Sequence, residues 1–161
     1  MINPSDGTAD LDEIDRRMVA ALVSDGRLSV RALAERVHIS RASAYSRLDR
    51  LLSSGVITGF SARVDPARAG LATSAYVALS VEQDAWREIS TRLRTARYVE
   101  RVSLLAADFD VLVLVHAPDN ATLRDVVLEE LQAIPGVRST RTWLVFADEA
   151  GPGAWMGEHL P

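Results

Sequence analysis

The sequence predicts an α+β protein with an N-terminal winged helix-turn-helix domain and a C-terminal ferredoxin-like βαββαβ domain. Three observations predict this fold. Three short amphipathic helical patterns follow one another before residue 55. From residue 73 the apolar residues alternate, as they do in a strand. The remaining segments then follow the order strand, helix, strand, strand, helix, strand.

Composition limits the class of protein. The chain has 161 residues, of which 48% are hydrophobic and 25% charged, as expected for one compact domain or two small ones. Its apolar runs are far shorter than the roughly 20 residues that span a bilayer, and residues 1–10 lack the features of a signal peptide. With no cysteine and only three histidines, we expect a cytoplasmic protein without a membrane span, metal or cofactor.

Charge is distributed unevenly along the chain. The net charge is −4, yet residues 27–63 contain seven arginines and two carboxylates, and are locally positive. From residue 66 onward, nine arginines face thirteen carboxylates. The two halves therefore favour different partners, and the first half favours a polyanion.

We expect the first helix over residues 11–23, with Asp10 as N-cap and Glu13 as its capping-box partner. Gly26 ends it, and Ser29 can cap a short second helix. The apolar stripes predict the inward residues Leu11, Ile14, Met18, Leu22 and Val23 in the first helix, and Val30, Leu33, Ala34 and Val37 in the second.

A third helix is expected from Ser40 to about residue 54, where Gly55 follows. Its apolar stripe is Ala44, Leu48, Leu51 and Leu52, and its opposite face is Ala42, Ser46, Asp49, Arg50 and Ser53, flanked by Ser43, Tyr45 and Arg47. A polar face of small and basic residues fits the major groove of DNA, and a helix start capped by Ser40 suits a phosphate. An ordinary solvated helix face has the same composition.

Residues 56–64 are rich in β-formers and predict a short ribbon that would complete domain 11–64. Arg63 at its end is placed to reach a phosphate, although a hairpin with only a structural role fits equally well. Residues 65–72 contain Pro66 and Gly70 and predict the linker.

The second domain is expected over residues 73–147. Strands are predicted over residues 73–81, 99–105, 111–115 and 137–146. Helices are predicted around Trp86, Ile89 and Leu93, and after a cap at Asp119 or Asn120, with Leu123, Val126, Val127, Leu131 and Ile134 facing inward. Two helices cover only one face of such a sheet, so we expect a homodimer that buries the other face, which carries Tyr76 and Trp143.

Residues 1–10 are expected to form a flexible arm. The tail, 148–161, is compatible with a loose segment or with docking on a neighbouring subunit.

Three segments carry a resemblance to a known family. They are LDEIDRRMVAALVSDGRLSVRALAERVHISRASAYSRLDRLLSSGVITGF, the central ADFD and the later IPGVRSTRTWLV. Together they resemble the leucine-responsive regulatory protein/AsnC family of feast-or-famine transcription regulators over about residues 11–147. The resemblance implies double-stranded DNA as a partner, dimers that often assemble into octamers, and an amino acid or related small-molecule effector bound between C-terminal domains.

The resemblance also implies site residues. The recognition helix corresponds to residues 40–54, with Arg41, Ser43, Tyr45, Ser46, Arg47 and Arg50 as DNA-contacting candidates. The effector site corresponds to Ala106, Ala107, Asp108 and Asp110 in a loop, with Ser139, Thr140 and Thr142 on the last strand.

Two positions depart from the family pattern. Ala107 stands where the family usually has glycine, which is unfavourable if that backbone takes a positive φ. His38 replaces a glycine in the turn before the recognition helix, and histidine tolerates the left-handed conformation better than most residues. We expect that turn to form.

Asp108 and Asp110 have the chemistry to accept hydrogen bonds from an ammonium group. They are equally suited to capping their loop and pairing with arginines.

The function we expect is a DNA-binding transcriptional regulator modulated by an amino acid. A ligand-independent architectural DNA-binding protein of the same fold is the main alternative. A metabolic enzyme or a protein-interaction adaptor are the others, although catalysis lacks a patterned set of acids and nucleophiles.

Overall fold

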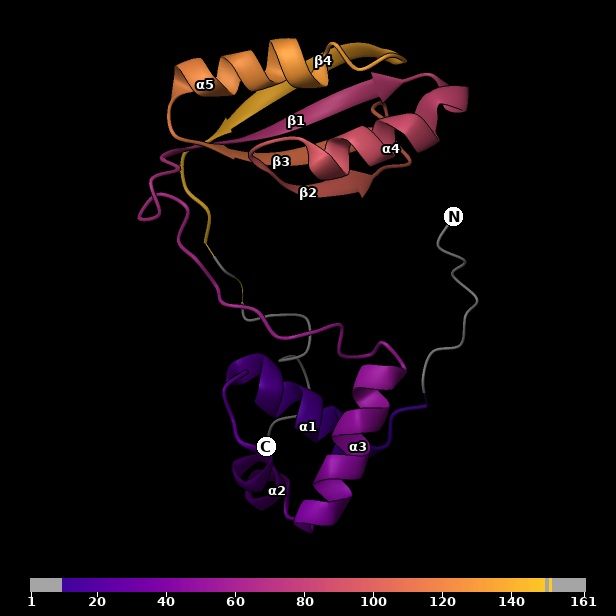
Figure 1. The fold of residues 1–161 in the computed structure, drawn as a ribbon, viewed down its shortest axis with the longest axis vertical. Helices are drawn as coiled ribbons and strands as arrows, with labels where there is room; N and C mark the ends of the chain where they lie inside the picture. Colours follow the sequence, from indigo (N-terminus) through magenta and orange to yellow (C-terminus); the bar gives the residue numbers. More distant parts are fainter. Residues whose placement is uncertain (1–9, 150, 152–161) are drawn as a thin grey trace. The chain divides into compact units, whose positions relative to one another are not determined.

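The computed structural model describes residues 10–149 and 151, in which the chain forms two compact units (Figure 1). The first unit runs to Arg63 and the second spans Val64–Glu149. The expected arm over residues 1–10 and the tail over 148–161 lie almost wholly outside the described residues. Within the described part, no helix is long and apolar enough to cross a bilayer.

The described residues of the first unit form three helices, α1 (Glu13–Ser24), α2 (Val30–Val37) and α3 (Arg41–Ser53). Ser29 and Ser40 cap α2 and α3, as predicted. The expected cap of α1 at Asp10 is wrong, because Asp12 is the N-cap and Asp15 its capping-box partner. The carboxylate of Asp12 accepts the N–H of Asp15 at 2.8 Å, and that of Asp15 accepts the N–H of Asp12 at 3.2 Å.

The turn between α2 and α3 forms as predicted. His38 adopts a left-handed conformation with φ 59° and ψ 50°, and its N–H closes the last turn of α2. The core of this unit is formed by Met18, Val19, Ala21, Leu22, Leu33, Val37 and Leu51. Val23 and Leu52 were expected inside but are 54% and 40% exposed, because each lies at the edge of its helix's apolar stripe.

The predicted ribbon over residues 56–64 is not present. Val56 and Ile57 pack against the core of the three helices, and residues 58–64 are exposed without strand pairing. An isolated two-stranded ribbon is marginally stable in water, so β-propensity alone does not form one here.

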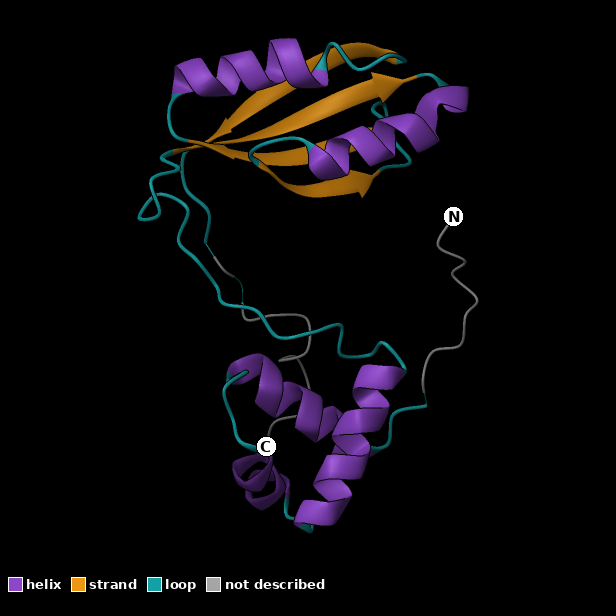
Figure 2. Ribbon diagram, in the orientation of Figure 1, coloured by secondary structure: helices purple, strands orange, loops and turns teal. Residues whose placement is uncertain are grey.

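The second unit is an antiparallel sheet in the order β2-β3-β1-β4, with two helical segments over one face (Figure 2). Its elements are β1 (Thr73–Val81), a 3-10 turn (Gln83–Ala85), α4 (Trp86–Thr95), β2 (Val99–Leu104), β3 (Val111–Ala117), α5 (Asn120–Asp125), a π-helical segment (Val126–Leu131) and β4 (Val137–Val145). This is the predicted ferredoxin-like order. All five residues predicted to face inward between 123 and 134 are buried.

One glycine is required where the π-helical segment leads into β4. Gly136 has φ +89°, and a Cβ built on it would lie 2.3 Å from the Cβ of Ala85. Only a residue without a side chain fits this turn.

Candidate nucleic-acid interface and ligand loop

The exposed face of α3 is the candidate nucleic-acid interface. Ala44 and Leu51 of α3 are buried against the other helices. The opposite side exposes Arg41, Ala42, Tyr45, Ser46 and Asp49, with Tyr45 63% exposed. The helix therefore presents a continuous polar stripe, with one aromatic ring, over its first two turns.

Ser40 prepares the start of this helix. Its hydroxyl accepts the N–H of Ser43 at 3.2 Å, which fixes the chain direction at the N-terminus of α3. The remaining N–H groups of a helix's first turn point outward along its axis and favour an anion. Ser43 itself is half-buried, whereas Arg63 is exposed on the segment that follows the helices.

Arg47 and Arg50 have partners inside the protein that the sequence did not reveal. Arg47 Nη1 lies 2.6 Å from Asp12 Oδ2 and 2.8 Å from Asp15 Oδ1. Arg50 Nη2 lies 2.5 Å from Asp15 Oδ2. The side chain of Asp15 is fully buried, that of Arg47 is 24% exposed and that of Arg50 is 56% exposed. Two predicted DNA contacts therefore also connect α3 to α1.

The same contacts shift two pKa values. The Asp15 backbone N–H, followed by the Arg47 side chain, holds the pKa of Asp12 below its usual value. Hydrogen bonds to Asp12 and then Asp15 raise the pKa of Arg47. Arg47 is therefore a cation whose charge is balanced by the carboxylates of Asp12 and Asp15.

The candidate ligand loop connects β2 to β3. Leu105 N–H donates to Asp110 O at 2.9 Å, and Asp110 N–H donates to Leu79 O at 3.0 Å. The Asp110 carboxylate accepts the N–H of Val81 at 2.8 Å. Asp110 thus fixes the loop to the end of β1, in line with the expectation that this aspartate caps its own loop.

The other loop residues, Ala106, Ala107 and Asp108, are exposed. In the described chain, the non-glycine residues with positive φ are His38 and Tyr98, so the alanine at 107 causes no backbone strain. Asp108 is exposed and makes no side-chain hydrogen bond or ion pair with any described residue.

The three candidate residues of β4 do not share one face of the sheet. Ser139 is opposite Ser80 of β1, whereas Thr140 and Thr142 are opposite Leu79 and Val77. Because paired residues point to the same side, Thr140 and Thr142 lie on the helix-covered side and Ser139 on the open side.

An aromatic cluster that was not predicted from the sequence connects the loop to β4. The rings of Phe109 and Trp143 meet edge to face with centroids 6.0 Å apart. The guanidinium of Arg141 lies 5.2 Å from the centroid of Phe109. The aromatic residue within ADFD was the available signal, but its partners come from a strand more than thirty residues later.

His116 lies on the open face of the sheet and is 8% exposed. Its Nδ1 is 2.7 Å from Ser74 Oγ, and its Nε2 contacts the carboxylate of Glu100. Both ring nitrogens of His116 therefore have partners within the second unit.

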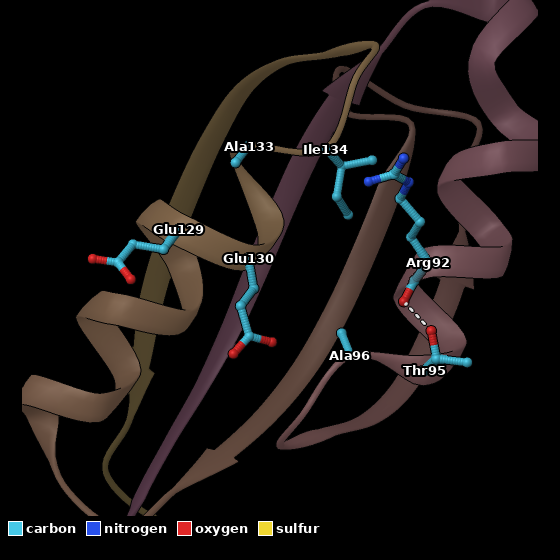
Figure 3. Close-up of a pocket in the computed structure, with 7 residues that line it drawn as sticks. All are labelled: Arg92, Thr95, Ala96, Glu129, Glu130, Ala133 and Ile134. Carbon is cyan, nitrogen blue, oxygen red and sulfur yellow. Dashed lines mark hydrogen bonds between the residues drawn. The ribbon is translucent and has the colours of Figure 1, made fainter.

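A separate pocket lies between α4 and the π-helical segment (Figure 3). Its volume is about 320 Å³, and it is lined by Arg92, Thr95, Ala96, Glu129, Glu130, Ala133 and Ile134. In Figure 3 the Glu130 side chain points into the space between the two helices, whereas Glu129 points away. None of the predicted effector residues lines this pocket.

A helix-turn-helix unit with an exposed polar recognition helix, followed by an antiparallel α+β unit, is an architecture typical of DNA-binding regulators. Comparison with known proteins supports this class. Residues 11–58 match the family model described as winged helix-turn-helix DNA-binding, and residues 74–149 match the Lrp/AsnC ligand-binding domain.

Named relatives agree with the family models. The chain is 39% identical to the HTH-type transcriptional regulator AldR of Mycolicibacterium smegmatis, over 89% of this chain and 86% of that one. It is 30% identical to the leucine-responsive regulatory protein of Escherichia coli K12, over 86% of this chain and 87% of that one. The chain belongs to the Lrp/AsnC family of transcriptional regulators.

Solved structures show the same fold. The leucine response regulatory protein LrpA of Mycobacterium tuberculosis superposes with a TM-score of 0.79 at 31% identity, covering 94% of this chain and all of that one. A transcriptional regulator of Neisseria meningitidis in complex with L-Met gives a TM-score of 0.81 at 24% identity, covering 88% of this chain and 93% of that one. The predicted class of protein, a transcriptional regulator rather than an enzyme, is confirmed.

Proposed function

We propose that this regulator binds duplex DNA as a homodimer through the exposed face of α3, and that an amino acid or related molecule at a subunit interface modulates its assembly or DNA affinity. The observation that carries the DNA-binding part is the stripe of Arg41, Tyr45 and Ser46 on a helix whose start is capped by Ser40. Major-groove readers contact bases with the N-terminal residues of the second helix of the motif, which is where these side chains lie.

The open sheet face supports the homodimer. Tyr76 pairs with Leu114 on one side and Trp143 on the other, so all three point away from the helices. Tyr76 is 37% and Trp143 44% exposed in a single chain. A second copy of the same face would remove these aromatic surfaces from water and form a two-fold interface. Assembly of such dimers into octamers is part of the same proposal.

The loop before β3 supports the effector part. Asp108 is exposed and available to an ammonium group, and Arg141, whose guanidinium lies over the ring of Phe109, is a candidate partner for a carboxylate. Phe109 and Trp143 offer an apolar wall for a side chain. The L-Met complex of the Neisseria meningitidis relative supports an amino acid as the class of ligand.

A quantitative binding assay tests the proposal. The full-length protein is titrated with duplexes enriched from a random-sequence pool, at several salt concentrations and with or without an amino-acid mixture. We expect affinity to fall steeply with salt, since arginine contacts to phosphates release counterions. Binding that is independent of salt would contradict the DNA interface.

The substitution Trp143→Asp tests the dimer by sedimentation. A charge on the open face should dissociate the assembly into monomers while the fold is kept, because the position is 44% exposed in the single chain. Unchanged mass would contradict the proposed interface.

The alternative, an architectural DNA-binding protein that answers no ligand, is favoured by Asp110, whose carboxylate already holds the loop to β1. Thermal-shift measurements with the amino acids separate the two functions, because a ligand bound to the folded state raises the melting temperature by mass action. No shift with any of them would favour the architectural function.

A further inference from the structure

The buried carboxylate of Asp15 is the most unusual group in the first unit. Within the described residues, it is the only acidic side chain that is fully buried. Both of its oxygens are occupied by guanidinium groups from α3, Oδ1 by Arg47 at 2.8 Å and Oδ2 by Arg50 at 2.5 Å. A buried carboxylate with two cationic partners constrains both helices that it joins.

Asp12 extends this cluster to the start of α1. It caps the helix through the N–H of Asp15 at 2.8 Å, and its other oxygen receives Arg47 Nη1 at 2.6 Å. The four side chains carry two positive and two negative charges and together are neutral. We call Asp12, Asp15, Arg47 and Arg50 the α1–α3 charge cluster.

The cluster changes which arginines are free to meet phosphates. In the linear sequence, Arg47 and Arg50 contribute to the positive charge of residues 27–63, while Asp12 and Asp15 fall outside that window. In the fold the four side chains are in contact. Arg31 is likewise paired, with Glu35 at 3.0 Å. Within the described residues, the arginines of this window without an ion pair are Arg27, Arg36, Arg41 and Arg63.

We propose that Asp15 is a positioning residue for DNA recognition, because it fixes the recognition helix on α1 through Arg47 and Arg50. Its ion pair with Arg47 also keeps that guanidinium from neutralising a DNA phosphate. Arg41 is the phosphate-neutralising arginine of α3, because it is exposed at the start of the helix and unpaired. Arg50 is intermediate, because it is bound to Asp15 but more than half exposed. This inference rests on the proposed binding of DNA by α3.

The matched pair Arg41→Gln and Arg47→Gln tests the charge assignment. Each variant removes one guanidinium from the same helix and keeps a long polar side chain. The full-length variants are titrated with random-sequence duplex DNA over a series of salt concentrations. Each neutralised phosphate contributes about 0.9 to the slope of log affinity against log salt. We expect Arg41→Gln to lower the slope by about 0.9 and Arg47→Gln to change it by less than about 0.3.

Asp15→Asn tests the positioning role. Asparagine keeps the size of the side chain but removes the negative charge that holds the two arginines. Released guanidinium groups should strengthen binding to random-sequence duplexes and steepen its salt dependence. Preference for duplexes enriched by the wild-type protein should fall about tenfold or more, because misplaced base contacts lose their discrimination. A purely structural role would weaken both kinds of binding together.

Arg124→Gln in the second unit is the control, since this arginine is also paired with a carboxylate at 2.8 Å but lies outside the helix-turn-helix unit. Equal losses of slope in Arg41→Gln and Arg47→Gln would overturn the inference, as would a parallel loss of selective and non-selective binding in a folded Asp15→Asn variant. If circular dichroism shows that Asp15→Asn is unfolded, the arginine pair decides alone. A wild-type protein without salt-dependent DNA binding would instead overturn the proposed function itself.

Discussion

The two units hold their elements together by different means. In the second unit the core residues are all apolar, and its buried polar side chain, His116, lies on the open face with Ser74. In the first unit a fully buried carboxylate lies between two helices and binds two arginines. One unit excludes charge from its core, and the other uses charge at the contact between its helices.

This difference in core composition follows from how strictly the backbone of each unit fixes the arrangement of its elements. Backbone hydrogen bonds of a four-stranded sheet fix strand register, and the helices need only pack against an apolar face. The three described helices of the first unit have no such ladder between them, and apolar packing specifies a unique arrangement less strictly than a hydrogen-bonded register does. Directional ion pairs supply that orientation, at a cost in desolvation.

Asp15→Ala should have the largest effect on stability. Removing the carboxylate breaks two ion pairs and half of the capping box, with an expected loss of about 3 kcal/mol in the free energy of unfolding of the first unit. Urea denaturation of the full-length protein measures it. Glu88→Ala is the control, because its ion pair with Arg92 is exposed and should contribute less than about 1 kcal/mol. Equal losses in the two variants would remove the contrast between the units.

Gly136→Ala should have the next largest effect, this time on the second unit. A methyl group there would meet Ala85 Cβ at 2.3 Å in a backbone with φ +89°. We expect a loss of about 2–3 kcal/mol. Gly70→Ala separates strain from clash, because Gly70 has φ +91° and nothing within 4 Å of a built Cβ. Its expected loss is about 1 kcal/mol, and thermal denaturation of both variants decides whether the difference exists.

The smallest effect concerns pH. Asp12 and Asp119 are both N-caps with lowered pKa values, Asp12 through the Asp15 N–H and Arg47, and Asp119 through the Thr122 N–H. A lowered folded-state pKa gives stability that is present above the unfolded-state pKa and is lost as pH falls through the folded-state pKa. Asp12→Asn and Asp119→Asn keep a good cap and remove the charge, so each should flatten the acid side of the stability curve.

Salt distinguishes these two caps. Arg47 contributes to the lowered pKa of Asp12, whereas the causes at Asp119 are hydrogen bonds from its own helix. Added salt should therefore reduce the effect of Asp12→Asn more than that of Asp119→Asn. Identical salt dependence in acid titrations would show that Arg47 does not influence Asp12.

The sequence was sufficient for features that depend on neighbouring residues. It predicted the caps at Ser29 and Ser40, the left-handed His38, and the apolar stripe from Leu123 to Ile134. Helical and strand periods specify these features locally. The predicted ribbon after α3 was wrong, because β-propensity does not supply the partner strand that a stable pair requires.

Features that depend on contacts between residues far apart in the chain could not be predicted from the sequence. The pairing of Arg47 with Asp15 joins residues 32 positions apart, and the opposite faces of Ser139 and Thr140 follow from the register of β4 on β1. Charge counted along a window placed Arg47 with free cations, whereas the fold places two carboxylates beside it. The loop motif gave Asp108 and Asp110 equal roles, which the hydrogen bond from Val81 N–H to Asp110 separates.

We propose the exposed face of α3 as the surface that binds duplex DNA. Ser46 lies in the middle of that face and makes no contact that its replacement would break inside the core. The measurement is the affinity of folded Ser46→Glu for duplexes enriched by the wild-type protein. A carboxylate facing the phosphates should weaken binding more than tenfold, which is about 1.4 kcal/mol or more. Wild-type affinity in this variant would show that DNA does not bind at the exposed face of α3.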